Sequence, residues 1–161
     1  VAGGAMGGLL AALLGTTRQV KALEGPGGRP TQSSWVQAVA AFCPALDLAE
    51  LSQKAAKAKL PRDPVADFLG VSCSANPKLC AEASPITHAG RDAAPFLLAH
   101  GTNDQVVPYH QSVAMANKLR QAGADAELFT VKGAPHGFFQ GPLWYAESLQ
   151  KMEEFFTRTL K

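Results

Sequence analysis

The sequence has no run of 18 consecutive apolar residues and no large excess of charge of either sign. It contains 15 Lys or Arg and 13 Asp or Glu among 161 residues, and its net charge is +2 at pH 7. A membrane-spanning helix needs about 20 apolar residues in a row, and nucleic-acid binding domains carry a strongly basic face. The apolar stretch 9–14 follows glycines without a basic region before it, so it does not resemble a signal peptide. We therefore expect neither a membrane nor a nucleic acid as a partner.

Cysteine and histidine are also scarce, with three and four copies. No spacing among them matches a structural zinc site, and we expect no metal and no organic cofactor. Cys43 lies in the apolar run VAAFC and is expected to be a buried thiol that acts as a small hydrophobe. Cys73 and Cys80 share the short segment SCSANPKLC, and an oxidising compartment would let them pair. The sequence leaves that pairing open, and with it the choice between a cytoplasmic and a secreted protein.

The composition is that of a globular protein, with 47% hydrophobic and 17% charged residues. The length predicts a single domain over 1–161. Apolar runs of strand length are expected at 36–43, 95–101 and 126–131. Helical patterns are expected at 6–14, 48–60, 64–70, 110–123 and 143–160, with a loop at 24–34. Because strands and helices alternate, the predicted fold is α/β, with a parallel sheet and helical crossovers.

Three positions fall where strands of such a sheet end, which is where catalytic groups collect. The segment GGAMGG fits the pattern G-x-S-x-G except that Ala5 stands where the pattern has its serine nucleophile. Asp104 lies in HGTNDQVVP after the second predicted strand, and His136 lies in KGAPHGFF after the third. An aspartate in a turn or a histidine in a loop is common in proteins, and neither alone indicates a catalytic site. Serine, aspartate and histidine positions in this chain order are the arrangement of α/β-hydrolases, in which the carboxylate fixes the tautomer of the imidazole.

Five segments extend this likeness over nearly the whole chain: GGAMGGLLAALLGT, SSWVQAVAAFCPALDL, ASPITH, HGTNDQVVPYHQS and GAPHGFF. Together they resemble the C-terminal portion of the esterase, lipase and prolyl-oligopeptidase-like α/β-hydrolases. The resemblance implies that Asp104 is the acid of a catalytic triad and that His136 is its general base. It implies that the Met6 amide supplies half of an oxyanion hole, and that Ala5 occupies the place of the nucleophile.

The function implied is that of a carboxylic ester hydrolase of the Ser-Asp-His type that is inactivated at Ala5 and takes a small-molecule ester as its substrate. A serine-to-alanine change, engineered or natural, is the simplest explanation of Ala5. Small acyl esters, feruloyl or acetyl esters of sugars, and peptides all stay open as substrates. The alternatives are a non-catalytic hydrolase-like protein that binds a ligand or partner in the old pocket, and a stable fragment with neither role.

Other polar residues near these motifs are assigned supporting roles. The loop hydroxyls that could replace a serine nucleophile are those of Ser33, Ser34, Ser84 and Thr102, and we expect none of them to do so. In the resembling family, the position of His100 orders the acid loop more often than it reacts. Tyr109 and Gln111 are expected to support the acid loop or the start of the helix after it, whereas His88 and His110 are interpreted as ordinary loop and helix-entry residues.

Two further features concern the surroundings of the site. Residues 46–88 lie where the resembling family inserts a cap, and the side chains that could line a pocket there are Leu46, Leu48, Phe68, Leu69 and Leu79. The alternative is that these side chains merely cover the sheet. The family's earlier strands are not in the chain, and a sheet of about three strands would expose an apolar edge. Either strands from elsewhere cover that edge, or a second copy of the chain completes the sheet as a homo-oligomer.

Overall fold

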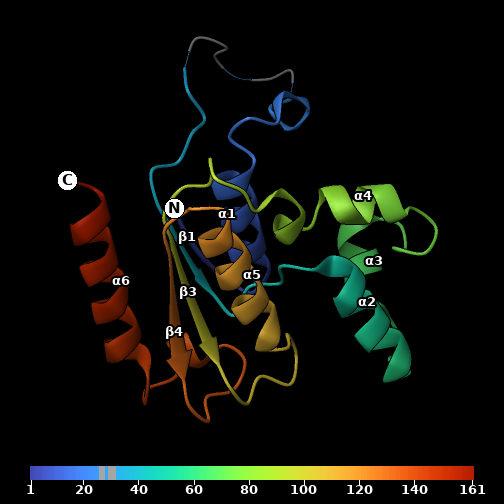
Figure 1. Ribbon diagram of the computed structural model, residues 1–161. Helices are drawn as coiled ribbons and strands as arrows, with labels where there is room; N and C mark the ends of the chain where they lie inside the picture. The colour runs from blue at the N-terminus through green and yellow to red at the C-terminus, as the bar shows by residue number, and fades with distance from the viewer. Residues whose placement is uncertain (26–27, 29–31) are drawn as a thin grey trace.

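A computed structural model describes residues 1–25, 28 and 32–161. Part of the loop expected at 24–34 therefore lies outside the described residues. The chain forms one parallel sheet in the order β1-β2-β3-β4, drawn with helices on either side in Figure 1. Its strands are Ala2–Gly4, Val39–Phe42, Phe96–Gly101 and Ala126–Val131. The predicted α/β class is confirmed, whereas the expectation of about three strands is wrong because β1 precedes Ala5.

The strand β1 has almost no local strand signal, since it consists of one alanine and two glycines, residue types that are depleted in strands. Its position is fixed by pairing with β2, in which Ala2 lies opposite Ala40. The N-terminal amine of Val1 donates to the Ala38 carbonyl at 2.9 Å, and the Ala5 amide donates to the Phe42 carbonyl at 2.8 Å. Only contacts with a segment almost 40 residues away define this strand.

Helices cover both faces of the sheet. On one face lie α1 (Met6–Thr16) and α5 (His110–Gln121), and on the other lies α6 (Tyr145–Thr159). The first face is packed by a cluster that includes Phe96, Leu98 and Met115. The second face is packed by a cluster that includes Leu97 and Phe155. Because β2 and β3 are buried on both faces, they read as continuous apolar runs in the sequence, as parallel strands do.

The helix α1 ends at Thr16, one residue past Gly15, and so close to the end that the sequence predicted. A Cβ atom at Gly15 would lie 2.3 Å from the Val39 side chain and 2.9 Å from the Phe96 ring. This glycine is therefore needed for close approach of the helix to the sheet.

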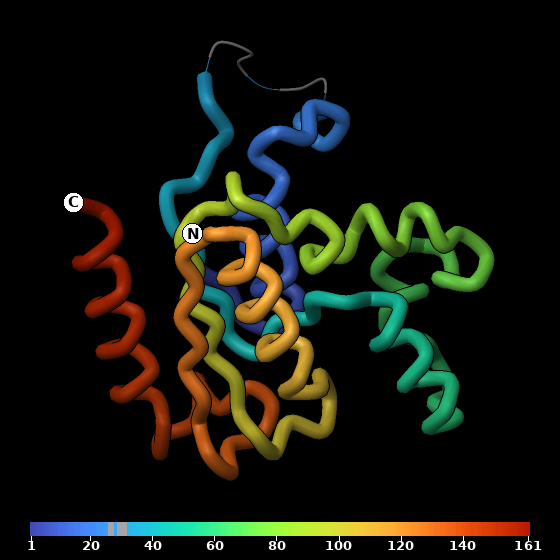
Figure 2. Tube along the Cα trace, viewed as in Figure 1, coloured from blue at the N-terminus to red at the C-terminus, as the bar shows by residue number. Residues whose placement is uncertain are grey.

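Residues 46–88 form a separate group of helices, which the tube in Figure 2 shows beside the sheet. The group contains α2 (Leu48–Lys57), α3 (Pro64–Leu69) and α4 (Pro77–Glu82). Asp47, Asp63 and Asn76 each accept a backbone N–H at the start of one helix. A third cluster, which includes Leu9, Leu51 and Val107, joins these helices to α1 and to the loop after β3. That contact brings α2 to the carboxyl ends of the strands.

Three short 3-10 helices complete the described structure, at Lys21–Leu23, Pro85–His88 and Phe138–Gln140. In the part of the chain that the structure describes, no helix has the length and apolarity needed to cross a bilayer. The prediction that residues 1–161 are one domain, with 46–88 as an insertion, stays a prediction.

Cys73 and Cys80 form a disulfide with a Cα–Cα distance of 5.2 Å, and Cys43 is a buried free thiol. The bond resolves the pairing that the sequence left open. It closes a loop between the end of α3 and the body of α4, and both sulfur-bearing residues pack in the third cluster.

Removal of this bond by the double substitution Cys73→Ala and Cys80→Ala should lower the free energy of unfolding by about 2–3 kcal/mol, because the unfolded chain regains the entropy of a short closed loop. Urea denaturation with and without reductant measures the effect. The double variant should not respond to reductant. Identical denaturation midpoints for the oxidised and reduced parent chain would contradict the prediction.

Candidate active site

The first element of the site is the turn between β1 and α1. Ala5 has φ 51° and ψ −117°, a backbone conformation that L-residues other than glycine rarely adopt. The turn is held because the Ala5 amide bonds to the end of β2 and the Ala5 carbonyl accepts from the Leu9 amide at 3.0 Å. Such strain costs about 1–3 kcal/mol and is found mostly at functional sites. The side chain at residue 5 is thereby presented at the carboxyl edge of the sheet.

Met6 is the first residue of α1, so its amide has no carbonyl partner within the helix. The positive end of the helix dipole lies at the same point. An unpartnered amide in this place can donate to an oxygen that gains negative charge. The role of Met6 as an oxyanion donor stays a prediction.

The second element is the loop after β3, in which Asp104 accepts four hydrogen bonds. Its Oδ1 atom accepts from the amides of Val106 at 2.8 Å and Val107 at 2.9 Å. Its Oδ2 atom contacts His136 Nδ1 at 2.7 Å and His100 Nε2 at 3.1 Å. Burial alone would raise the pKa of the Asp104 carboxyl, but the His136 hydrogen bond and the two amides outweigh it and hold this pKa below its usual value. The carboxylate is therefore ionised at neutral pH.

The third element is the loop after β4, which carries His136 to Asp104. The Asn103 amide donates to the Ala134 carbonyl at 3.0 Å and so joins this loop to the acid loop. Gly101 makes the approach possible, because a Cβ atom there would lie 2.2 Å from the Ala134 carbonyl oxygen. Since Asp104 is a carboxylate, Nδ1 of His136 donates to it and Nε2 is left as the basic nitrogen. The His136 side chain is 24% exposed, whereas that of Asp104 is fully buried.

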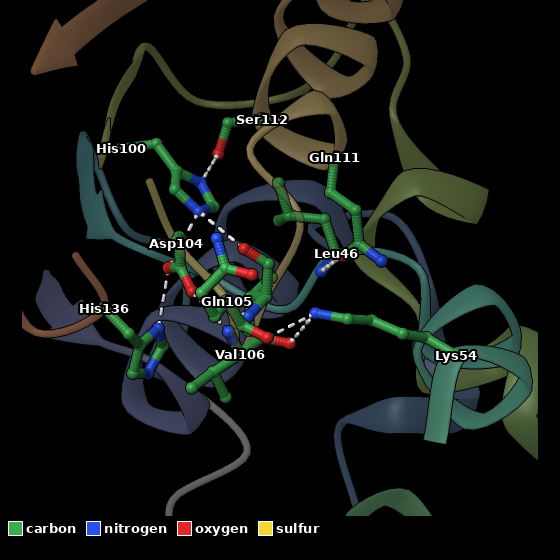
Figure 3. A network of polar contacts seen from close by, with 10 residues as sticks. Leu46, Lys54, His100, Asp104, Gln105, Val106, Gln111, Ser112 and His136 are labelled. Carbon is green, nitrogen blue, oxygen red and sulfur yellow. Dashed lines mark hydrogen bonds and ion pairs between the residues drawn. The ribbon is translucent and has the colours of Figure 1, made fainter. Parts of the chain in front are cut away.

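His100 approaches the same carboxylate from a different side, as Figure 3 shows. Its Nε2 lies 3.1 Å from both Asp104 Oδ2 and the Val107 carbonyl oxygen, and its Nδ1 lies 2.7 Å from Ser112 Oγ. Two acceptors face Nε2, so Nε2 carries the proton and Nδ1 accepts from the Ser112 hydroxyl. Burial lowers the pKa of His100 and is only partly opposed by Asp104. A neutral imidazole thus buttresses the acid loop, in the supporting position that the sequence suggested.

Cys43 is a neighbour of the site that the sequence did not place there. Its sulfur and ligand atoms of Asp104 and His136 all lie within 4.8 Å of one another. Burial, reinforced by the negative charge of Asp104, raises the pKa of the Cys43 thiol to about 11. A neutral thiol is neither a good nucleophile nor a good metal ligand, since the thiolate is the reactive form. The apolar run VAAFC predicted the burial of Cys43 correctly but gave no signal of this proximity.

A pocket of about 430 Å³ opens beside these elements, and both Ala5 and His136 line it. Residues 46–88 do contribute to it, but none of the five side chains proposed for that purpose does. Leu46 and Leu48 are fully buried in the core, and Phe68, Leu69 and Leu79 lie elsewhere. The residues of this segment that line the pocket are Leu51, Lys54, Ala55, Ala58, Leu60 and Pro64. The five side chains considered from the sequence therefore do not line this pocket, because the sequence did not show which face of α2 meets the acid loop.

The remaining polar residues have structural partners. Gln111 is buried and accepts from the Leu46 amide at 2.9 Å, and it donates to Glu50 at 3.0 Å, so it supports the start of α2 and not the acid loop. Tyr109 bonds to Thr130 at 2.7 Å. His88 contacts the Glu82 carbonyl at 2.8 Å, and His110 contacts the Glu50 carboxylate.

The four other hydroxyls do not line the pocket that holds Ala5 and His136. Ser84 is buried, donates to the Cys80 carbonyl at 2.7 Å and accepts from the Leu48 amide at 3.0 Å. Thr102 accepts from the Gly133 amide at 2.8 Å. Ser33 and Ser34 are exposed and bond to Trp35 and Glu24.

An open parallel sheet with a strained strand-to-helix turn, a carboxylate after β3 and an imidazole after β4 defines the α/β-hydrolase fold. A family model described as BD-FAE matches residues 1–119. The chain belongs to this BD-FAE family, which lies within the superfamily that the sequence motifs indicated.

Solved structures of esterases share the fold. Esterase 2 of Thermogutta terrifontis, with propionate bound, is 30% identical with a TM-score of 0.75, and the match covers 98% of this chain and 54% of that one. A truncated carbohydrate esterase from gut microbiota is 30% identical with a TM-score of 0.83, over 98% of this chain and 58% of that one. Among curated proteins, esterase LipC of Mycobacterium tuberculosis is 36% identical over 64 residues, which are 39% of this chain and 16% of LipC. The chain thus spans little more than half the length of these solved relatives and a smaller part of LipC.

The strain at residue 5 predicts that Ala5→Gly stabilises the protein by about 1 kcal/mol. Glycine adopts a φ of 51° without steric cost, which outweighs the added freedom of the unfolded chain. Thermal unfolding measures the change. The matched control is Ala12→Gly, inside α1, which should destabilise the protein because glycine disfavours an ordinary helical position. Equal losses of stability in both variants would show that residue 5 is unstrained.

The buried neutral His100 predicts a loss of stability in mild acid. A histidine in the unfolded chain has a pKa near 6.5, whereas the pKa of His100 in the folded state is lower. As the pH falls below about 6.5, the unfolded chain therefore binds a proton at this residue before the folded chain does, which favours unfolding. The free energy of unfolding should fall below about pH 6.5, by at most about 1.4 kcal/mol per pH unit for this residue. The lowered pKa of Asp104 adds a further loss below about pH 4.

Urea denaturation between pH 5 and pH 8 measures this dependence. In His100→Gln the slope near pH 6 should be smaller, whereas His88→Gln, which changes a histidine with a single backbone contact, should keep the parent slope. A parent slope retained in His100→Gln would refute the assignment.

Proposed function

We propose that this chain carries the acid and base of a carboxylic ester hydrolase, with an alanine at residue 5 in place of the nucleophilic serine. The hydrogen bond of 2.7 Å between His136 Nδ1 and the buried Asp104 carboxylate carries the proposal. Its support is that Ala5 and His136 line one pocket and that the relatives described above are named esterases. Asp104 orients His136, and Nε2 of His136 is the atom that accepts and returns protons.

The chemistry follows once a hydroxyl is placed on residue 5. His136 removes its proton while the oxygen attacks the ester carbonyl, and the Met6 amide stabilises the oxyanion that forms. The protonated His136 then donates to the leaving alcohol, which departs as the carbonyl reforms in an acyl-enzyme. A water molecule releases the acid by the same two steps. The methyl group of Ala5 can neither attack nor be acylated, so this sequence of steps stops at ester binding.

The substitution Ala5→Ser should raise the rate of hydrolysis of p-nitrophenyl acetate at least about a thousand-fold, since loss of the nucleophile in serine hydrolases costs up to about a million-fold. The strained backbone at residue 5 supports this expectation, because the serine of the G-x-S-x-G pattern stands on a strained strand-to-helix turn. Steady-state kinetics measure the gain. Mass spectrometry after exposure to a fluorophosphonate should show a single adduct on residue 5.

The control combines Ala5→Ser with His136→Ala, which should return the rate to that of the parent. A second control combines Ala5→Ser with Ser34→Ala, an exposed hydroxyl away from the pocket, and should keep the gain. If Ala5→Ser hydrolyses esters no faster than the parent chain, the proposed function is wrong.

Ala5 itself favours a second candidate, a protein that binds an ester or a similar neutral ligand without turning it over. The pocket and the unreactive methyl group support this function. Ligand binding by the parent chain, combined with no gain of hydrolysis in Ala5→Ser, would favour it over the ester hydrolase.

A further inference from the structure

The ring of Phe139 connects two parts of the site that hydrogen bonds leave separate. His136 is held by its hydrogen bond to the acid loop, whereas residue 5 is held by the pairing of β1 with β2. Among the described residues, no hydrogen bond joins the turn 3–6 to the loop 133–141. Ala5 and His136 nevertheless line one pocket, so their relative position depends on packing between these two segments.

The tip of the Phe139 ring occupies the space that a side chain at residue 4 would take. A Cβ atom placed on Gly4 would lie 2.2 Å from the Cζ atom of Phe139 and 2.9 Å from each of its Cε atoms. Carbon atoms pack at about 3.5–4.0 Å, so this ring and a side chain at residue 4 exclude each other. Gly4 is the last residue of β1 and directly precedes Ala5. The ring therefore packs on the backbone that leads into residue 5.

The same ring rests on the end of β2. Its centroid lies 5.2 Å from that of Phe42, a separation typical of aromatic pairs. Gly4 and Phe42 are partners in the register of β1 and β2, so both positions face the same side of the sheet. The Phe42 carbonyl also accepts the Ala5 amide. One ring thus contacts both strands that fix the backbone of residue 5.

Phe139 follows His136 by three residues and lies in the short helix Phe138–Gln140. Gly137 has φ 72°, a left-handed conformation that glycine adopts without steric cost, and it turns the chain from His136 into this helix. The Phe138 ring is buried in the cluster on the second face of the sheet and meets Phe139 edge to face at 6.0 Å. A displacement of Phe139 is therefore transmitted over only three residues to the imidazole.

We propose that Phe139 is a positioning residue, whose ring, seated against Gly4, sets the approach of the His136 imidazole to the side chain of residue 5. This inference rests on the proposed function, because it concerns a proton that passes between these two positions. A displacement of about 1 Å at a reacting pair costs about a hundredfold in rate, so one packing contact is enough to control the transfer. Glycine at the variable position before residue 5 is needed because the ring fills the space there.

An exchange of volume between the two positions tests the contact in the Ala5→Ser background. Gly4→Ala should lower kcat for p-nitrophenyl acetate at least about tenfold, because the new methyl group expels the ring. Gly4 has no positive φ, and the atom that its Cβ would meet is the tip of a half-buried ring, so the chain can fold with the ring displaced. Phe139→Leu shortens the side chain. It should lower kcat when residue 4 is glycine and raise it when combined with Gly4→Ala.

Two further readouts separate positioning from a general loss of structure. KM and the pH midpoint of kcat/KM should change little in these variants, because Gly4 and Phe139 do not line the pocket and the bond between His136 and Asp104 is untouched. The matched control is Phe156→Leu, the same substitution at another half-buried ring packed on the same cluster. It should leave kcat unchanged and should not restore Gly4→Ala.

Three outcomes would overturn the proposal. They are additive losses for Gly4→Ala and Phe139→Leu, an equal restoration of Gly4→Ala by Phe156→Leu, and a loss that appears in KM alone.

Alkylation of a thiol tests the same geometry without ester hydrolysis. In Ala5→Cys, the His136 imidazole should promote ionisation of the introduced thiol and speed its reaction with iodoacetamide at pH 7, relative to the same chain with His136→Ala. Cys43 is buried with a pKa raised to about 11, and the other two cysteines are paired, so they should not compete. Gly4→Ala should slow the alkylation at least about fivefold, and Phe139→Leu should then restore it. Mass spectrometry locates and counts the adducts.

The two proposals fail separately. If Ala5→Ser does not hydrolyse esters but alkylation in Ala5→Cys responds to Gly4→Ala and Phe139→Leu as expected, the proposed function is wrong and the positioning contact stands. If Ala5→Ser is active and neither kcat nor alkylation follows the exchange of volume, Phe139 has no positioning role and the proposed function stands.

Discussion

The buried carboxylate of Asp104 is the constraint around which this end of the molecule is organised. An ionised group without solvent is costly unless hydrogen bonds replace the water, and here two amides and two imidazoles do so. These donors lie in three different parts of the structure. The amides fold the acid loop back on itself, His100 ties it to β3, and His136 brings in the loop after β4. The geometry that would make His136 a base is thus also the geometry that makes the buried charge tolerable.

The backbone strain at Ala5 is not explained by the alanine itself. An alanine gains nothing from a φ of 51°, and no chemistry is available to its methyl group. The conformation is imposed by pairing of β1 with β2 on one side and by the first turn of α1 on the other. The scaffold therefore imposes this conformation on residue 5 even though its side chain is an unreactive methyl group.

The group of helices over 46–88 links the pocket to the acid loop. Gln111 accepts the Leu46 amide just before α2 and so holds the start of this helix. Leu51 of α2 packs in one cluster with Val107, and the end of the helix lies beside the pocket that Ala5 and His136 line. Lys54 connects it to the backbone of the acid loop. In this arrangement one helix forms a wall of the pocket and also steadies the loop that holds the carboxylate.

The sequence by itself determined the α/β class, the strands β3 and β4 and the loops that carry Asp104 and His136, because apolar runs bounded by glycine and proline are local signals. It did not reveal β1, whose Ala-Gly-Gly has no strand preference, or the close packing of Gly15 against Val39 and Phe96. It also misplaced the pocket lining and gave no sign of Cys43 beside Asp104. Those features depend on which faces meet after folding, and such contacts between distant segments leave no periodic pattern in the chain. Tertiary structure alone decided them.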